Sequence, residues 1–93
     1  MAGKALIVDD EQVIVDLVRY HLEKEGLHCL EASDGETALQ LAKDQRPDVM
    51  VLDLMLPGID GLEICRLLRR DTATAGIAIL MLTAKAEEVD RIV

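Results

Sequence analysis

The chain has 93 residues, enough for one small domain and too few for two. Aliphatic, aromatic and cysteine residues make up 51% of it, but Tyr20 is its one aromatic residue, so a compact core must be built from aliphatic side chains. With 18 acidic against 10 basic residues, the net charge of -8 argues against contact with nucleic-acid phosphates or anionic lipid and favours cations or basic surfaces as partners.

Strand-like and helix-like patterns alternate from the start of the chain. The apolar run 5–8 predicts a strand buried on both faces. An amphipathic helix is predicted over 12–25, ending before Gly26, and a second strand over 27–32. The residues predicted to form the buried stripe of this helix are Ile14, Leu17, Val18 and Leu22.

The alternation continues through the second half of the chain. The sequence Ser33-Asp-Gly-Glu36 has the form of a capping box, which predicts a second helix that stops before Pro47. A third buried strand is predicted over 49–52 and ends at Asp53. The remaining predicted elements are a turn at 56–58, a helix that Asp60 opens, a strand over 77–82 and a helix over 87–92.

Four strand-then-helix units with short connections predict an α/β fold, with a parallel sheet, right-handed crossovers and helices on both faces. In such a sheet the carboxyl ends of the strands share one edge. Asp9 and Asp10 follow the first predicted strand, and Asp53 follows the third. Thr83 follows the fourth, so all of these side chains are expected at the same edge.

Three carboxylates close together stay ionised only beside a cation, and Mg²⁺ fits best because it prefers octahedral oxygen ligands and completes its shell with water and phosphate oxygens. A partly exposed carboxylate beside such an ion can accept a phosphoryl group, with Thr83 donating a hydrogen bond to a phosphoryl oxygen. Taken singly, these acidic residues are better explained as helix caps and turn residues. Their joint order along the chain is what favours a site.

Three motifs resemble the receiver domain of two-component response regulators: Leu6-Ile-Val-Asp-Asp-Glu11, Asp53-Leu-Met-Leu-Pro-Gly-Ile-Asp-Gly61 and Leu82-Thr-Ala84. The match runs through 1–93 and implies one receiver domain with the family's flavodoxin-like, doubly wound parallel sheet, here in the strand order 2-1-3-4. Segment 54–61 is most similar to receivers joined to winged-helix transcription factors. Contact with DNA is therefore expected only through an output domain that this chain does not contain.

The resemblance implies that Asp53 accepts a phosphoryl group from a phosphohistidine on a sensor histidine kinase. It further implies that Asp10 and Asp53 bind Mg²⁺ directly and that Asp9 does so through water. The backbone carbonyl of Met55 would supply another ligand, and Thr83 matches the hydroxyl residue that moves toward the phosphoryl group. Such a chain is a phosphoacceptor with slow self-dephosphorylation, not an enzyme that acts on a separate substrate.

The sequence departs from the family at its C-terminal end. A fifth strand, a fifth helix and an active-site Lys followed by Pro are all expected after Val93 and are absent, and Lys85 is a poor substitute for that Lys. Without a fifth strand, the strand over 77–82 becomes an exposed edge with unpaired backbone groups. We therefore predict self-association through this edge.

Two alternative functions remain open. Because part of the family's chemistry is missing, the chain could be a receiver-like module that binds proteins but no longer signals by phosphorylation. A hydrolase of the phosphoaspartyl type is the weaker alternative, since it would need a second Asp two positions after the nucleophile, where Met55 stands.

The location and the sulfur-containing residues have simpler interpretations. Apolar runs reach about half a dozen residues, against about 20 for a membrane span, and the first strand leaves no room for a signal peptide. We expect a cytoplasmic protein without membrane contact. Cys29 and Cys65 are expected to be core thiols, and Met50, Met55 and Met81 to be core fillers.

Overall fold

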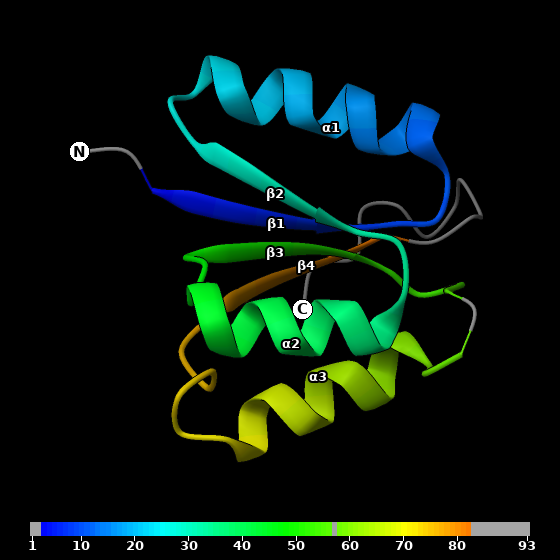
Figure 1. Cartoon of the computed structure of the whole chain (residues 1–93), viewed down its shortest axis with the longest axis vertical. Helices are drawn as coiled ribbons and strands as arrows, with labels where there is room; N and C mark the ends of the chain where they lie inside the picture. The colour runs from blue at the N-terminus through cyan, green and yellow to red at the C-terminus, as the bar shows by residue number, and fades with distance from the viewer. Residues whose placement is uncertain (1–2, 57, 83–93) are drawn as a thin grey trace.

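The structure is a computed structural model that describes residues 3–56 and 58–82. Its elements are β1 (Lys4–Val8), α1 (Gln12–Lys24), β2 (His28–Ala32), α2 (Gly35–Gln45), β3 (Val49–Asp53), α3 (Gly61–Arg70) and β4 (Ala78–Leu82). All strand pairs are parallel, and the sheet order is β2-β1-β3-β4 (Figure 1). The predicted α/β fold and its strand order are confirmed.

Some predicted features lie outside the described residues: the helix over 87–92, the site residue Thr83 and the nearby Lys85. Within the described ranges, none of the helices combines the length and the apolar character that a membrane crossing requires.

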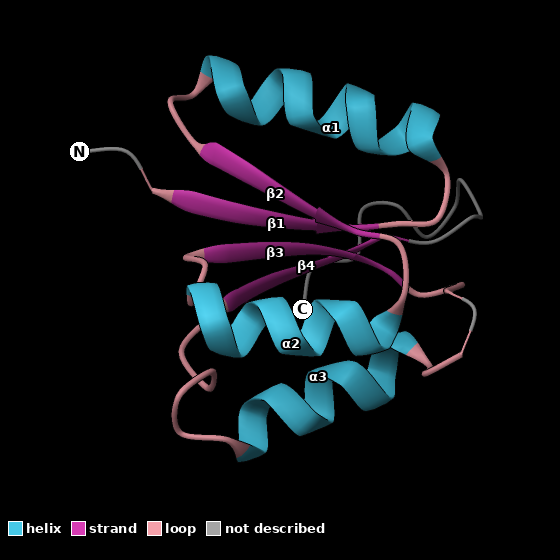
Figure 2. Cartoon of the chain, in the orientation of Figure 1, coloured by secondary structure: helices cyan, strands magenta, loops and turns pink. Residues whose placement is uncertain are grey.

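Helices cover both faces of the sheet. Figure 2 shows α1 on one face and α2 with α3 on the other. Alternate residues of each buried strand supply the two sides: Leu6 of β1 packs into the larger cluster under α2 and α3, whereas Ile7 packs into the smaller cluster under α1. Cys29 belongs to the smaller cluster and Cys65 packs against the larger one, and burial raises the pKa of both thiols. Cys29 is therefore the buried core thiol that the sequence predicted, whereas Cys65 is only partly buried at the margin of the core.

The buried stripe of α1 differs from the predicted one. Leu17 was expected to face the core, but its side chain is 56% exposed, while Val15 is only 2% exposed. Val18 and Leu22 do pack against the core as predicted. Residues 15, 18 and 22 recur with the helical period just as the predicted residues do. The apolar pattern of α1 is therefore compatible with two buried faces, and packing on β1 and β2 selects between them.

The start of α2 also differs by one residue from the prediction. Asp34, not Ser33, is the N-cap, and its Oδ1 accepts a hydrogen bond of 2.8 Å from the Thr37 backbone N–H. A carboxylate is a stronger acceptor than a hydroxyl and carries the negative charge that a helix N-terminus favours. The helix therefore begins where the better acceptor lies.

The β3–α3 connection is tightly packed, and it carries the end of the strand that bears Asp53. Asp60 caps α3, accepting a hydrogen bond of 2.9 Å from the Leu62 backbone N–H. Gly61 opens the helix so close to the preceding turn that a Cβ atom there would lie 3.0 Å from the Leu54 Cα. Gly58 has a φ of 83°, a conformation that favours glycine.

Candidate functional site

Three carboxylates meet at the edge of the sheet where the strands end. Val8 and Leu52 are partners in the parallel register of β1 and β3, so the residues that follow them emerge side by side. Asp9, Asp10 and Asp53 each place a carboxylate oxygen within 4.8 Å of the other two. The convergence expected from the sequence is therefore present for these three residues.

Asp9 and Asp53 are held in equivalent ways. Asp9 is 6% exposed and accepts a hydrogen bond of 2.9 Å from the backbone N–H of Glu11. Asp53 is 9% exposed and accepts a hydrogen bond, also of 2.9 Å, from the backbone N–H of Met55. In each case the N–H two residues further along the chain holds Oδ1, which leaves the second carboxylate oxygen for another partner. Asp10, in contrast, is exposed to solvent.

Within the described residues, no ion pair neutralises the negative charge of the three carboxylates. The pKa of Asp9 is raised above its ordinary value, mainly because burial disfavours the charged form and in addition because Asp53 and Asp10 repel it. The hydrogen bond from Glu11 offsets part of this effect. The ion pairs within the described residues join other side chains, and none of them includes these three carboxylates. A bound cation would relieve the repulsion.

The geometry fits Mg²⁺. In an octahedral shell with oxygens about 2.0–2.1 Å from the ion, opposite ligands lie about 4.2 Å apart and adjacent ligands about 2.9 Å apart. Carboxylate oxygens within 4.8 Å of one another can share one ion if their side chains move closer together, or one of them can bind through water. The backbone hydrogen bonds to Asp9 and Asp53 provide the outer support that metal-binding carboxylates usually have.

Met55 is the one residue of the predicted set whose interpretation changes. Its side chain is 68% exposed, so the prediction that it fills the core is wrong, whereas Met50 and Met81 are buried at 0% and 4% exposure. Its backbone N–H orients Asp53. The role of its carbonyl as a metal ligand stays a prediction.

A small hollow next to Asp9 was not anticipated from the sequence. It measures about 190 Å³ and lies between the start of α1 and the end of β2, with Gln12, Glu31 and Ser33 among its lining residues. The sequence did contain a signal for Ser33, because it directly follows β2 and the carboxyl ends of parallel strands share one edge. The hollow therefore lies on the α1 side of Asp9.

The outer face of α1 carries a second unanticipated feature, an exposed apolar stripe formed by Val13, Leu17 and Tyr20. Their side chains are 79%, 56% and 59% exposed. The spacings of four and three residues place them on one face of the helix, opposite the buried Val15. This α1 stripe begins within one turn of the N-terminal end of the helix, which follows directly after the carboxylates.

Comparison with known proteins identifies relatives of this chain. The family model described as "Response regulator receiver domain" matches residues 5–93. The alkaline phosphatase synthesis transcriptional regulatory protein PhoP of Bacillus subtilis (strain 168) is 50% identical over 92 residues, which cover 99% of this chain and 38% of that protein. The chain thus spans less than half the length of this relative.

Solved structures show the same architecture. The N-terminal domain of a response regulator receiver protein from Methanoculleus marisnigri JR1 matches with a TM-score of 0.84 and 38% identity, over 91% of this chain and 69% of that one. The receiver domain of the sensor histidine kinase PA1611 from Pseudomonas aeruginosa PAO1 matches with a TM-score of 0.85 and 30% identity, over 98% of this chain and 75% of that one. The latter structure has a magnesium ion coordinated in its active site cleft.

Proposed function

Because the chain belongs to the response regulator receiver domain family, we propose that it is a phosphoacceptor signalling domain whose Asp53 takes a phosphoryl group from a sensor histidine kinase. The observation that carries this proposal is the meeting of Asp9, Asp10 and Asp53 at the carboxyl end of the sheet, with oxygens within 4.8 Å of one another. Such a cluster suits a reaction that brings a phosphoryl group to a carboxylate, because both reactants are anionic and need a shared cation.

In this proposal four residues hold Mg²⁺ in different ways. Asp10 and Asp53 bind the ion directly, Asp9 binds through water, and the Met55 carbonyl completes the protein ligands. The ion, when bound, neutralises the charge that builds up between the acceptor and the incoming phosphoryl oxygens. The magnesium ion in the related PA1611 receiver domain supports this assignment.

Asp53 acts as the nucleophile. Its Oδ1 is held by the Met55 N–H, which leaves the second oxygen to attack phosphorus. The new O–P bond forms as the P–N bond of the donor phosphohistidine breaks, and the imidazole leaves. Thr83 donates a hydrogen bond to a phosphoryl oxygen. Water later hydrolyses the aspartyl phosphate slowly, so the chain turns over no separate substrate and is not an enzyme in that sense.

A partner that donates a phosphoryl group must dock against the surface around the site. The α1 stripe is suited to receive it, because Val13 and Leu17 are exposed apolar side chains on the helix that begins next to the carboxylates. Exposed apolar surface of this kind marks protein contacts. We assign the α1 stripe to the contact with the kinase.

The setting we propose is transcriptional control in the cytoplasm. The 50% identical relative is a transcriptional regulatory protein, and this chain spans 38% of its length. The chain itself is acidic, with a net charge of -8, and is unsuited to bind DNA phosphates. Contact with DNA would be made by an output domain that is not among these residues.

We further propose that the chain self-associates through β4. Within the described residues β4 pairs only with β3, and none of these residues pairs with the backbone on its other side. Its sequence AILML contains neither a charge nor a proline, the features that usually protect an edge strand. The opposite edge strand, β2, differs in that it contains a charged residue, Glu31, which forms an ion pair of 2.5 Å with Arg19 of α1.

The competing function is a receiver-like binding module that is not phosphorylated. Incubation with acetyl phosphate and Mg²⁺ followed by intact mass spectrometry distinguishes the two. We expect the wild type to gain one phosphoryl group and Asp53→Asn to gain none, while Asp44→Asn, which changes an exposed carboxylate on α2, should behave as the wild type. A wild type without an adduct, or an adduct that persists in Asp53→Asn, would refute the phosphoacceptor proposal.

A further inference from the structure

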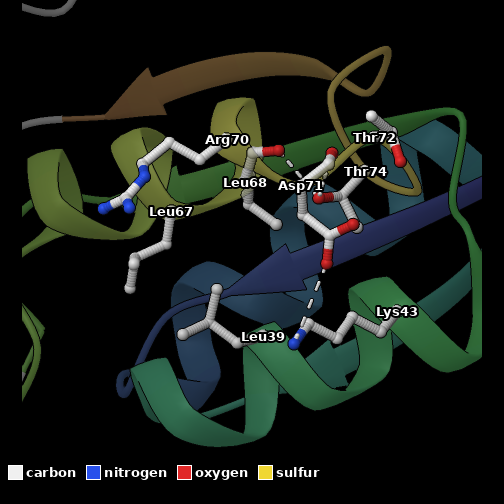
Figure 3. A pocket seen from close by; sticks show the side chains of 8 residues that line it. All are labelled: Leu39, Lys43, Leu67, Leu68, Arg70, Asp71, Thr72 and Thr74. Atoms are coloured by element: carbon white, nitrogen blue, oxygen red, sulfur yellow. Dashed lines mark hydrogen bonds and ion pairs between the residues drawn. The ribbon is translucent and has the colours of Figure 1, made fainter.

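A hollow of about 590 Å³ lies between the C-terminal halves of α2 and α3, and we call it the α2–α3 pocket. Figure 3 shows Leu39 and Lys43 of α2 on one side of it and Leu67 and Leu68 of α3 on the other. Helices that follow parallel strands run back across the sheet, so the C-terminal ends of α2 and α3 lie at the edge opposite to the carboxylates. The pocket is therefore separate from the phosphoacceptor site.

One wall of the pocket is formed by the α3–β4 connection, and this wall is already ordered. Thr74 is 0% exposed, and its hydroxyl donates a hydrogen bond of 2.8 Å to the Leu68 carbonyl. Arg69 Nη1 donates to the carbonyls of Ala75 and Ile77 at 2.7 and 2.6 Å. A wall held in this way does not have to be ordered when a ligand binds, which favours affinity.

The polar groups at the rim carry more positive than negative charge. Lys43 faces Asp71 across the mouth of the pocket, but the Nζ–Oδ2 distance is 3.8 Å and the two side chains are 60% and 37% exposed. An ion pair this long and this exposed stabilises little and is easily replaced. Arg70 of the opposite wall makes no ion pair with any described residue. The lining thus holds two cations and one anion, and Figure 3 shows the Arg70 guanidinium beside Leu67, directed away from Lys43 and Asp71.

We propose that the α2–α3 pocket binds a small organic carboxylate with an apolar body. The leucines offer an apolar floor, the carboxylate pairs with Lys43 in place of Asp71, and Arg70 adds positive charge elsewhere on the rim. The volume lies within the range of about 300–1,000 Å³ typical of small-molecule sites. A cationic ligand would meet two like charges, and a neutral one would leave them unmatched.

The affinity for a small probe should be modest. Lys43 and Arg70 lie in the last turns of their helices, where the negative ends of the helix dipoles already attract them. A ligand of about a dozen non-hydrogen atoms then reaches a dissociation constant on the order of millimolar. This is within the range of amide chemical-shift titration.

The test is a titration of the ¹⁵N-labelled chain with 4-phenylbutyrate, 4-phenyl-1-butanol and 4-phenylbutylamine to about 10 mM each. We expect the carboxylate to shift amide signals around Leu39, Lys43 and 67–74, and the alcohol and the amine to bind at least about fivefold more weakly. Absence of shifts there, equal binding of the alcohol, or shifts confined to other parts of the chain would overturn the proposal.

Variants of the charged residues should change the affinity for phenylbutyrate in opposite directions. The double variant Lys43→Gln with Arg70→Gln should weaken phenylbutyrate binding about tenfold, whereas Asp71→Asn should strengthen it about threefold because Lys43 loses its competitor. The amide oxygen introduced by Asp71→Asn can still accept a hydrogen bond from the Ala73 N–H, as Asp71 Oδ1 does, so the loop is kept.

Arg46→Gln removes a cation outside the pocket and should leave binding unchanged. An Arg46 variant as weak as the double variant would show a long-range charge effect instead of a site.

Discussion

Asp9 and Asp53 make the same contact on neighbouring strands: the Oδ1 of each accepts a hydrogen bond from the backbone N–H two residues further along, at 2.9 Å. Val8 and Leu52, which precede them, are register partners, so the two carboxylates are placed side by side by the sheet itself. Both are therefore oriented before any ion arrives. In this arrangement the two carboxylates repel each other, and water screens the repulsion poorly because both residues are almost buried.

The first prediction follows from that repulsion. Asp9→Asn keeps an acceptor for the Glu11 N–H but removes a buried charge, so in the presence of a chelator the free energy of unfolding should rise by about 1 kcal/mol. In the presence of Mg²⁺ the stabilisation by the ion should be smaller than in the wild type. Urea titrations with chelator and with Mg²⁺ measure both effects, and Asp44→Asn serves as the control. A loss of stability in Asp9→Asn under chelator would contradict the prediction.

The close packing at the start of α3 gives a second prediction. In Gly61→Ala the new Cβ would lie 3.0 Å from the Leu54 Cα and 3.3 Å from the Asp53 carbonyl oxygen, so backbone must move. We expect a loss of about 1–3 kcal/mol in unfolding free energy and weaker Mg²⁺ binding, because the shifted segment carries Asp53. Gly76→Ala is the matched control, since a Cβ there meets nothing within 4 Å. Equal stability of the two variants would show that the turn yields without strain.

The cap of α2 predicts a dependence of stability on pH. The pKa of Asp34 is lowered, mainly by the hydrogen bond from the Thr37 backbone N–H. A carboxyl with a lowered folded-state pKa stabilises the fold above its ordinary pKa of 3.8, and this contribution is lost as the pH falls through the folded-state value. Asp34→Asn keeps a capping oxygen that does not titrate. The stability of the wild type relative to Asp34→Asn should therefore fall in denaturant titrations as the pH is lowered from about 5 to below 3.8. If the stabilities of the wild type and Asp34→Asn changed in parallel with pH, the proposed contribution of the Asp34 carboxylate would be excluded.

The edge of β4 yields a fourth prediction. Sedimentation velocity at increasing concentration should show the wild type forming dimers, and Leu80→Lys should stay monomeric because a charge on an edge strand opposes pairing. Leu80 is 37% exposed. The control is Leu62→Lys, which places the same charge on an apolar residue of α3 that is 62% exposed. A wild type that remains monomeric at the highest concentrations would refute self-association.

Much of the fold followed from the sequence because its signals are local. The apolar runs of β1 and β3 are long enough for strands and are closed by aspartates, and alternation with helices leaves a parallel sheet as the simplest topology. That topology alone brings the ends of the strands to one edge, and so it predicted that Asp9 and Asp53 meet. These inferences need only the order of the elements.

Other features depend on how each element is rotated and packed, and only the tertiary structure decided them. The pattern of α1 allowed Leu17 or Val15 to face the sheet, and contacts with residues distant in sequence chose Val15. The α2–α3 pocket likewise exists because two helices that are separate in sequence diverge above the strands, with Thr74 fixing the wall between them. Local propensity sets which residues form a helix, whereas the face that is buried and the space left beside it result from packing across the whole domain.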